Sequence, residues 1–101
     1  MPSRDSDLQN LAAENLQYSS QIPTLDLHGN TVHLALPELE GFLNSKFMAE
    51  EEVVKIICGI GTGKLLHSVG KVLEEYKQHG LVESFVQPKS GGVFIVFLSE
   101  K

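Results

Sequence analysis

A glycine-rich run with one lysine, residues 59–64 (GIGTGK), lies near the middle of the 101-residue sequence. Alternate glycines let a backbone adopt conformations closed to other residues and approach a ligand without an intervening Cβ. A helical pattern follows the run, so unpaired first-turn amides, the positive end of the helix dipole and Lys64 would meet at one place. These features predict a phosphate-binding loop.

The spacing of the run excludes the two common nucleotide motifs. A P-loop needs four residues between its first glycine and the Gly-Lys pair, whereas three separate Gly59 from Gly63, and Leu65 replaces the hydroxyl residue. A dinucleotide fingerprint would need a third glycine at position 64, which is Lys64. The alternative is a tight strand-to-helix turn with no ligand, although one such turn rarely needs three glycines.

An acid and an imidazole, Asp26 and His28, form the second candidate site. Residues 22–28 read as a buried strand with two leucines on one face and this pair on the other. Ligands gather at the carboxyl ends of parallel strands, so the pair and the glycine run would share one rim if strand 22–28 neighbours strand 53–58. The pair would then be part of a site at that rim or, alternatively, would hydrogen-bond the loop backbone and hold the turn in place.

The remaining reactive side chains give weaker signals. Cys58 is the single cysteine, which excludes an internal disulfide, and it reads as a small buried apolar residue rather than a nucleophile. Lys89, beside a Ser-Gly-Gly turn, is either a further phosphate contact or an ordinary exposed turn residue. Three histidines lack Cys or acid partners at ligand spacing, which indicates surface or capping roles and gives no support for zinc: His33, His67 and His79.

The elements that would position these residues follow the order βαβαββ. A strand, a helix and a second strand imply a right-handed parallel crossover, and the last two strands form a hairpin through Gly91 and Gly92. The order predicts an α/β fold, a two-layer α/β sandwich with a four-stranded mixed sheet and two helices. The expected strands are residues 22–28, 53–58, 82–87 and 93–98.

The two predicted helices differ in how clearly they are bounded. The first carries apolar residues from Val32 to Phe47, but Pro37 interrupts the pattern. Either this helix is kinked there, or it begins at Leu36 with Pro37 in its first turn. The second helix follows the glycine run and ends at Gly80 as its C-cap.

Composition sets limits on domains, location and partners. Residues 1–21 form a polar extension in which residues 6–18 favour a short helix that packs on the domain or frays, and residues 22–101 form the domain. No long apolar stretch or signal-peptide pattern is present, which predicts a cytoplasmic protein with no membrane partner, and the default is a monomer. The net charge of −5 predicts that any nucleic-acid binding is local and weak at ordinary salt. The acidic run at residues 50–52 reads as a solvated loop.

Two ordered motifs, residues 25–29 (LDLHG) and residues 59–65 (GIGTGKL), resemble the Smr (small MutS-related) domain family. That family carries a Leu-Asp-Leu-His-Gly motif followed by a His-Gly-x-Gly-Thr-Gly motif. The resemblance covers residues 24–98 and implies a βαβαββ sandwich similar to the C-terminal domain of bacterial initiation factor three. It also implies binding of branched or single-stranded DNA or RNA and, in some members, a metal-dependent nicking endonuclease linked to DNA repair or recombination.

The resemblance also implies roles for individual residues. Asp26 would hold Mg²⁺ or Mn²⁺, or orient a water, and His28 would act as general acid or base or contact phosphate. Lys64 and the amides of Gly61 to Gly63 would clamp the phosphodiester. The complete set of implied phosphate contacts is Gly59, Gly61, Thr62, Gly63, Lys64 and Lys89.

Two positions depart from the family pattern. Cys58 stands where the family usually has histidine, and Leu34-Ala35 stands where it usually has Glu-Ala. These departures favour an alternative, a nucleic-acid-binding module without catalysis. A third hypothesis is a protein-interaction domain that binds its partner through the helical face.

Overall fold

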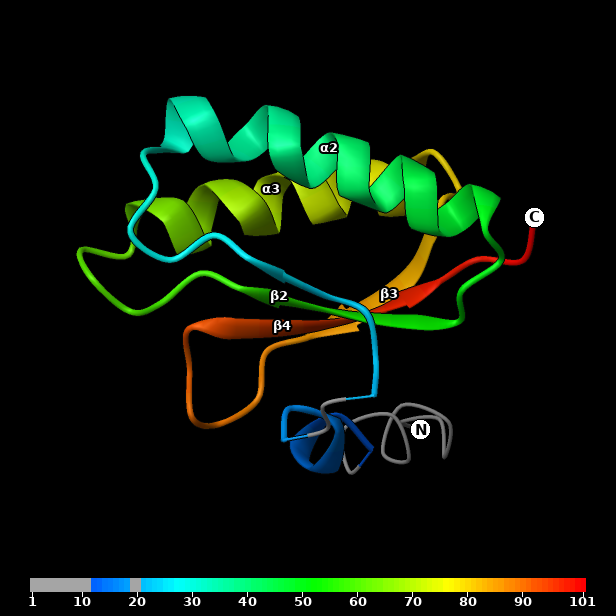
Figure 1. Ribbon diagram of the computed structural model, residues 1–101, viewed down its shortest axis with the longest axis horizontal. Helices are drawn as coiled ribbons and strands as arrows, with labels where there is room; N and C mark the ends of the chain where they lie inside the picture. The colour runs from blue at the N-terminus through cyan, green and yellow to red at the C-terminus, as the bar shows by residue number, and fades with distance from the viewer. Residues whose placement is uncertain (1–11, 19–20) are drawn as a thin grey trace.

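The computed structural model of the protein describes residues 12–18 and 21–101. Its α2 and α3 helices lie together on one face of a four-stranded sheet (Figure 1). The predicted two-layer α/β sandwich and the βαβαββ order are confirmed. The elements are β1 (Thr24–Asp26), α2 (Val32–Met48), β2 (Val53–Ile57), α3 (Lys64–Gln78), β3 (Val82–Val86) and β4 (Val93–Leu98).

The sheet has the strand order β1-β2-β4-β3. β1 pairs with β2 in parallel, and β4 pairs antiparallel with both β2 and β3. Asp26 is in register with Ile57, and the backbone N–H of Leu27 donates to the Ile57 carbonyl at 2.7 Å. The carboxyl ends of β1 and β2 therefore lie side by side, as the shared rim requires.

Three of the four strands are shorter than predicted, most of all β1, whereas β4 has the predicted bounds. The expected strand 22–28 ends at Asp26, because the chain turns at residues 28 and 29, where Gly29 has φ +82°. The N–H of Asn30 closes this turn by donating to the Leu27 carbonyl at 3.0 Å. Strands 53–58 and 82–87 were each predicted one residue too long.

Helix α2 begins at Val32, so the predicted start at Leu36 is wrong. The Thr31 hydroxyl caps the helix by accepting a hydrogen bond from the Leu34 amide at 3.3 Å. Pro37 lies inside the helix, at a solvent-exposed position. A strong cap and a continuous apolar stripe therefore outweigh the one backbone hydrogen bond that the proline removes.

The hydrophobic core lies between the helices and the sheet. Each helix presents a buried stripe, and the alternate residues Val54 and Ile56 of β2 face it. Phe85 and Phe94 add an edge-to-face aromatic pair with ring centroids 5.8 Å apart. The fully buried helix residues are Ala35, Leu39 and Leu43 of α2 with Val69 and Leu73 of α3.

The opposite face of the sheet is covered by the N-terminal segment, residues 12–18, whose helical part is residues 12–16 (Figure 1). Ala13 is fully buried, and so is Ile95, which lies outside the main core cluster. Lys55 Nζ donates to the Gln17 carbonyl at 3.0 Å. Of the predicted helix 6–18, residues 6–11 lie outside the described residues, and the described part packs on the domain.

Within residues 12–18 and 21–101, no helix is both long and apolar enough to cross a lipid bilayer.

Candidate nucleic-acid interface

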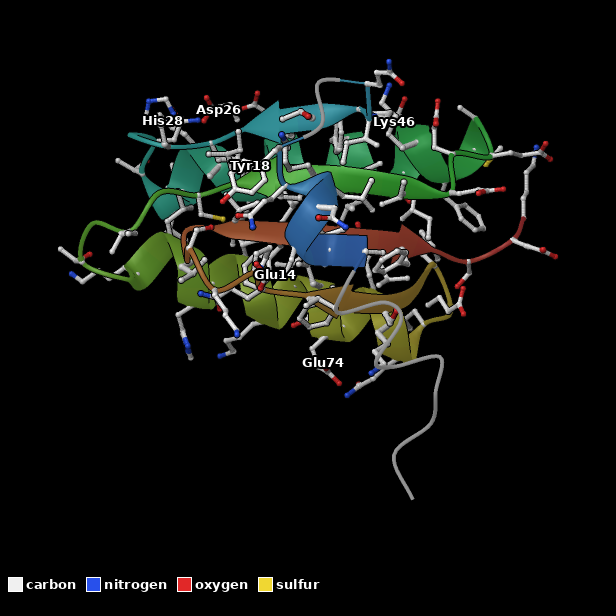
Figure 2. The ribbon with its side chains drawn as sticks, turned by 90° about the horizontal axis from the view of Figure 1, so that it is seen from below. Glu14, Tyr18, Asp26, His28, Lys46 and Glu74 are labelled. Atoms are coloured by element: carbon white, nitrogen blue, oxygen red, sulfur yellow. The ribbon has the colours of Figure 1, made fainter. Side chains whose placement is uncertain are left out.

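Asp26 and His28 contact each other at the end of the edge strand β1 (Figure 2). Asp26 Oδ1 accepts the backbone N–H of His28 at 3.1 Å and lies 2.5 Å from His28 Nδ1. The hydrogen bond from the His28 side chain lowers the pKa of Asp26, so the carboxyl is ionised at neutral pH. An ionised carboxylate only accepts, so Nδ1 carries the proton and Nε2 is the ring nitrogen left to act on a ligand.

One carboxylate oxygen serves both roles considered for this pair. The contact from Asp26 to the amide two residues later is an Asx turn, which redirects the chain where β1 ends. The same oxygen orients the imidazole, whose side chain remains 68% exposed. The turn-holding and acid-base interpretations are therefore compatible.

The glycine loop, residues 59–63, has a conformation that explains its composition. Gly59, Gly61 and Gly63 have φ of +76°, +43° and +84°, in the left-handed region that strains residues with a Cβ. A Cβ on Gly59 would lie 3.3 Å from the Cβ of His28, so this glycine also permits the close approach of the two motifs. The structure therefore brings the Asp-x-His pair and the glycine loop to one rim.

The amides of this loop divide into two groups. Those of Cys58 and Gly59 donate to the Gly92 carbonyl at 2.7 and 3.0 Å, and that of Gly63 donates to the Ile60 carbonyl at 3.0 Å. Within the described residues, the amides of Gly61, Thr62, Leu65 and Leu66 have no hydrogen-bond acceptor. The clamp predicted from the amides of Gly61 to Gly63 thus retains two of its three donors, and the first turn of α3 supplies two more.

A cavity of about 390 Å³ lies between the glycine loop and residues 29–32, which lead into α2. Lys64 lines this cavity and adds a full positive charge beside the free amides. Both α2 and α3 begin at the cavity, so their positive dipole ends converge there. The arrangement can stabilise one anionic group, with the Asp26–His28 pair next to it.

Cys58 lies at the inner side of this cavity and is 4% exposed. Burial raises the pKa of its thiol to about 11, so the thiolate is scarce at neutral pH. Since the thiolate is the nucleophile and the metal ligand, Cys58 has a packing role. It is part of the hydrophobic core cluster.

Lys89 does not line the cavity, but its loop supports the site. Its backbone N–H donates to Glu14 Oε1 of the N-terminal segment at 2.9 Å. The same loop, residues 88–92, carries Gly92, whose carbonyl holds the glycine loop. A Cβ on Gly92 would lie 3.1 Å from the carbonyl carbon of Gly59. From the sequence, Gly92 was predicted to be a turn residue only. The presence of a second glycine after Gly91 could have indicated that the backbone there approaches another segment closely.

The described residues do not fit a metal held by the protein alone. No three His, Cys, Asp or Glu side chains among them gather closely enough to hold an ion. The Asp26 carboxylate supplies oxygen ligands, but Oδ1 already accepts from His28, and Mg²⁺ requires six oxygens.

His79, one of the three histidines expected to have surface or capping roles, contacts the Glu75 carbonyl at the end of α3.

Comparisons by sequence give one consistent family. The model of the Smr domain family matches residues 25–99. The endonuclease MutS2 of Aquifex aeolicus (strain VF5) is 39% identical over 77 residues, which are 74% of this chain and 10% of that protein. The endonuclease MutS2 of Halothermothrix orenii is 43% identical over 53 residues, 52% of this chain and 7% of that protein. The chain thus spans a tenth or less of these relatives.

Comparisons by structure agree with the sequence. The crystal structure of the Smr domain of Thermus thermophilus MutS2 matches with a TM-score of 0.68 at 31% identity, covering 76% of this chain and 98% of that one. The solution structure of the SMR domain of NEDD4-binding protein 2 matches with a TM-score of 0.56 at 26% identity. It covers 82% of this chain and 92% of that one.

Proposed function

The chain belongs to the Smr domain family, and on that premise we propose that it binds nucleic acid by holding a backbone phosphate at the glycine loop. The observation that carries this proposal is the set of unpaired amides at Gly61, Thr62, Leu65 and Leu66, with Lys64 beside them. A phosphate oxygen accepts several hydrogen bonds at once and is favoured by a helix N-terminus. MutS2 relatives that are named endonucleases support a polynucleotide as the source of that phosphate.

Charge limits the strength of this binding. With a net charge of −5, the chain repels a polyanion at long range, so attraction must come from the local donors and Lys64. Few phosphates are then neutralised, and the dependence of affinity on salt is shallow compared with that of a basic protein.

Amide chemical shifts in a nucleic-acid titration test the proposal. We expect single-stranded, duplex and branched DNA and RNA, added in turn at low salt, to shift Gly61, Thr62 and Leu65. The Gly63 amide, already bonded to Ile60, should shift less. Raising the salt concentration should reverse the changes. No shift at low salt with any of these nucleic acids would refute nucleic-acid binding and leave a protein-interaction domain.

A second candidate function, phosphodiester cleavage, is favoured by the contact between Asp26 and His28. With Nδ1–H held by the carboxylate, Nε2 is placed to take the proton from an attacking hydroxyl group or water. The attacking oxygen then bonds to phosphorus, the bond to the leaving oxygen breaks, and the proton that Nε2 has taken up is transferred to that oxygen, directly or through a water. Nicking of branched DNA would place the protein in repair or recombination.

A nicking assay separates binding from cleavage. Wild type, Asp26→Asn and His28→Ala are compared on branched DNA and on structured RNA, with Mg²⁺, with Mn²⁺ and with a chelator. We expect His28→Ala to reduce cleavage by ~10²–10⁴-fold, the range of a general acid-base contribution, and Asp26→Asn to reduce it less, because the imidazole remains. Lys101→Ala, distant from the rim, serves as the control and should cleave as wild type does. Equal or absent cleavage in all variants would remove catalysis and leave the binding function intact.

A further inference from the structure

The cavity beside the glycine loop has features that a phosphate alone would not use. Val32, Leu65 and Ile60 line it together with polar residues. Ile60 is 69% exposed, although it lies at the tip of a loop that would meet a charged group. Free amides and a cation suffice for phosphate, so these apolar side chains suit a neighbouring group with an apolar face.

A polar residue, Asn30, also lines the cavity, in the segment that leads into α2. The backbone N–H of Asn30 donates to Leu27, but within the described residues its exposed side-chain amide has no hydrogen-bond partner. The next residue, Thr31, already uses its hydroxyl to cap α2. An asparagine amide both donates and accepts, which matches the edge of a nucleobase.

The charge balance shows why such a contact would matter. Among the described residues, Lys64 is the one lysine or arginine that lines the cavity, so electrostatic attraction beyond this local contact contributes little to affinity. Bases packed against side-chain surfaces add affinity in single-strand binding that does not depend on charge. In a duplex the base is stacked and paired, so it must be extracted before it can enter the cavity.

We propose that this cavity receives one unpaired nucleobase, packed against Ile60 and hydrogen-bonded by Asn30, while the glycine loop holds the adjoining phosphate. The inference rests on the proposed nucleic-acid binding and specifies its substrate: a strand with at least one unpaired nucleotide. Ile60 and Asn30 are then specificity residues, and neither takes part in cleavage.

Binding of matched oligonucleotides to the full chain tests the inference. The probes are a short single strand, its duplex, and the same strand with abasic sites that keep the phosphates. We expect Ile60→Ser and Asn30→Ala to weaken single-strand binding by ~5-fold or more. Duplex affinity and the salt dependence should stay unchanged. The abasic strand should bind wild type and both variants equally.

Leu34→Ser is the matched control, because Leu34 is 63% exposed on α2 but does not line the cavity. It should bind the single strand as wild type does. Equal affinity of wild type for single strand and duplex, or equal effects of Ile60→Ser and Leu34→Ser, would overturn the base-binding inference. Absence of binding to every probe would instead refute the proposed function itself.

Discussion

Cavities of opposite character lie at the two ends of strand β2. These ends lie on opposite sides of the molecule (Figure 1). At the carboxyl end of β2 lies the cavity with free amides and Lys64. At its amino end a cavity of about 270 Å³ is lined by residues 50–52, all glutamates, and by residues 98–101 of the C-terminus. Both helices begin at the first end, and α2 ends near the second.

This difference shows that the position of charge matters more than its total. Helix N-termini and a lysine favour an anion at one end, while carboxylates near the C-terminus of α2 repel it at the other. A chain with a net charge of −5 can therefore still attract a polyanion at this end of the molecule, where the helices begin. The following predictions test whether the two ends are as distinct as the structure indicates.

The largest effect is expected at the backbone contact that holds the glycine loop. Gly91 and Gly92 have similar φ, +73° and +70°, so alanine is strained at both. Only at Gly92 would the new Cβ meet backbone, 3.1 Å from the carbonyl carbon of Gly59. We expect Gly92→Ala to lower the unfolding free energy by ~2–3 kcal/mol and Gly91→Ala by ~1 kcal/mol.

Urea unfolding midpoints of the two glycine variants measure this difference. Because the stabilising contact belongs to the site end, Gly92→Ala should also weaken oligonucleotide binding under conditions where the variant remains folded. Equal loss of stability in both variants would show that the close approach of the two loops contributes nothing beyond backbone strain.

The second prediction compares one lysine from each end. Lys64 lies beside the free amides, whereas Lys101 lines the acidic cavity. We expect Lys64→Ala to weaken single-strand binding ~10-fold, the loss of one hydrogen bond to a charged group, and Lys101→Ala to leave it unchanged. Fluorescence anisotropy of a labelled oligonucleotide measures both. A comparable loss in Lys101→Ala would show that overall charge, rather than the rim, governs binding.

The sequence predicted the parts of this site that follow from local pattern. Alternating apolar residues and turn glycines indicated the order of elements, and the end of a parallel strand placed Asp26 and His28 near the glycine loop. The boundaries of β1 were wrong because a tight turn ends the strand early, and of the two alternatives for α2 only the start at Leu36 was wrong. Pro37 inside α2 is tolerated through tertiary packing, which a propensity rule does not contain.

The sequence pattern could not predict contacts between residues that are far apart in the chain. Nothing in the pattern pairs Gly59 with Gly92, or Glu14 with the amide of Lys89, because each contact joins segments that are distant in the sequence. The hydrogen bond that occupies the Gly63 amide depends on the dihedral angles of residues 60–63. Sequence reasoning therefore located the rim, and the structure was needed to show which of its donors are free.

The third prediction concerns pH at the site end. The pKa of Asp26 is lowered from 3.8 in the folded state by its hydrogen bond with His28, so ionised Asp26 stabilises the fold above pH 3.8. This contribution to the free energy of unfolding is lost as the pH falls from 3.8 through the lower pKa that Asp26 has in the folded state. Both side chains are exposed, so the ion pair contributes little. We expect Asp26→Asn to lower the free energy of unfolding by less than ~1 kcal/mol at pH 7, and not to change it at a pH below the folded-state pKa of Asp26.

Urea unfolding of wild type and Asp26→Asn across this pH range checks the sign. In a His28→Ala background, Asp26→Asn should lower the free energy of unfolding by less, because the side chain that lowers the pKa of Asp26 is gone. A pH-independent difference, or an undiminished cost in that background, would assign the stabilisation to a contact other than this pair.

The smallest effect is expected at the acidic end, from Glu51→Gln combined with Glu52→Gln. These side chains do not line the site cavity, and the molecule extends 27 Å or more along each principal axis. Because charges are screened over ~8 Å at physiological salt, removing two of them should not change the dissociation rate of a bound strand. Association should quicken by less than ~2-fold at low salt and not at all at physiological salt. Stopped-flow measurements separate the two rates, and a slower dissociation in the double variant would mean that the strand reaches the acidic end.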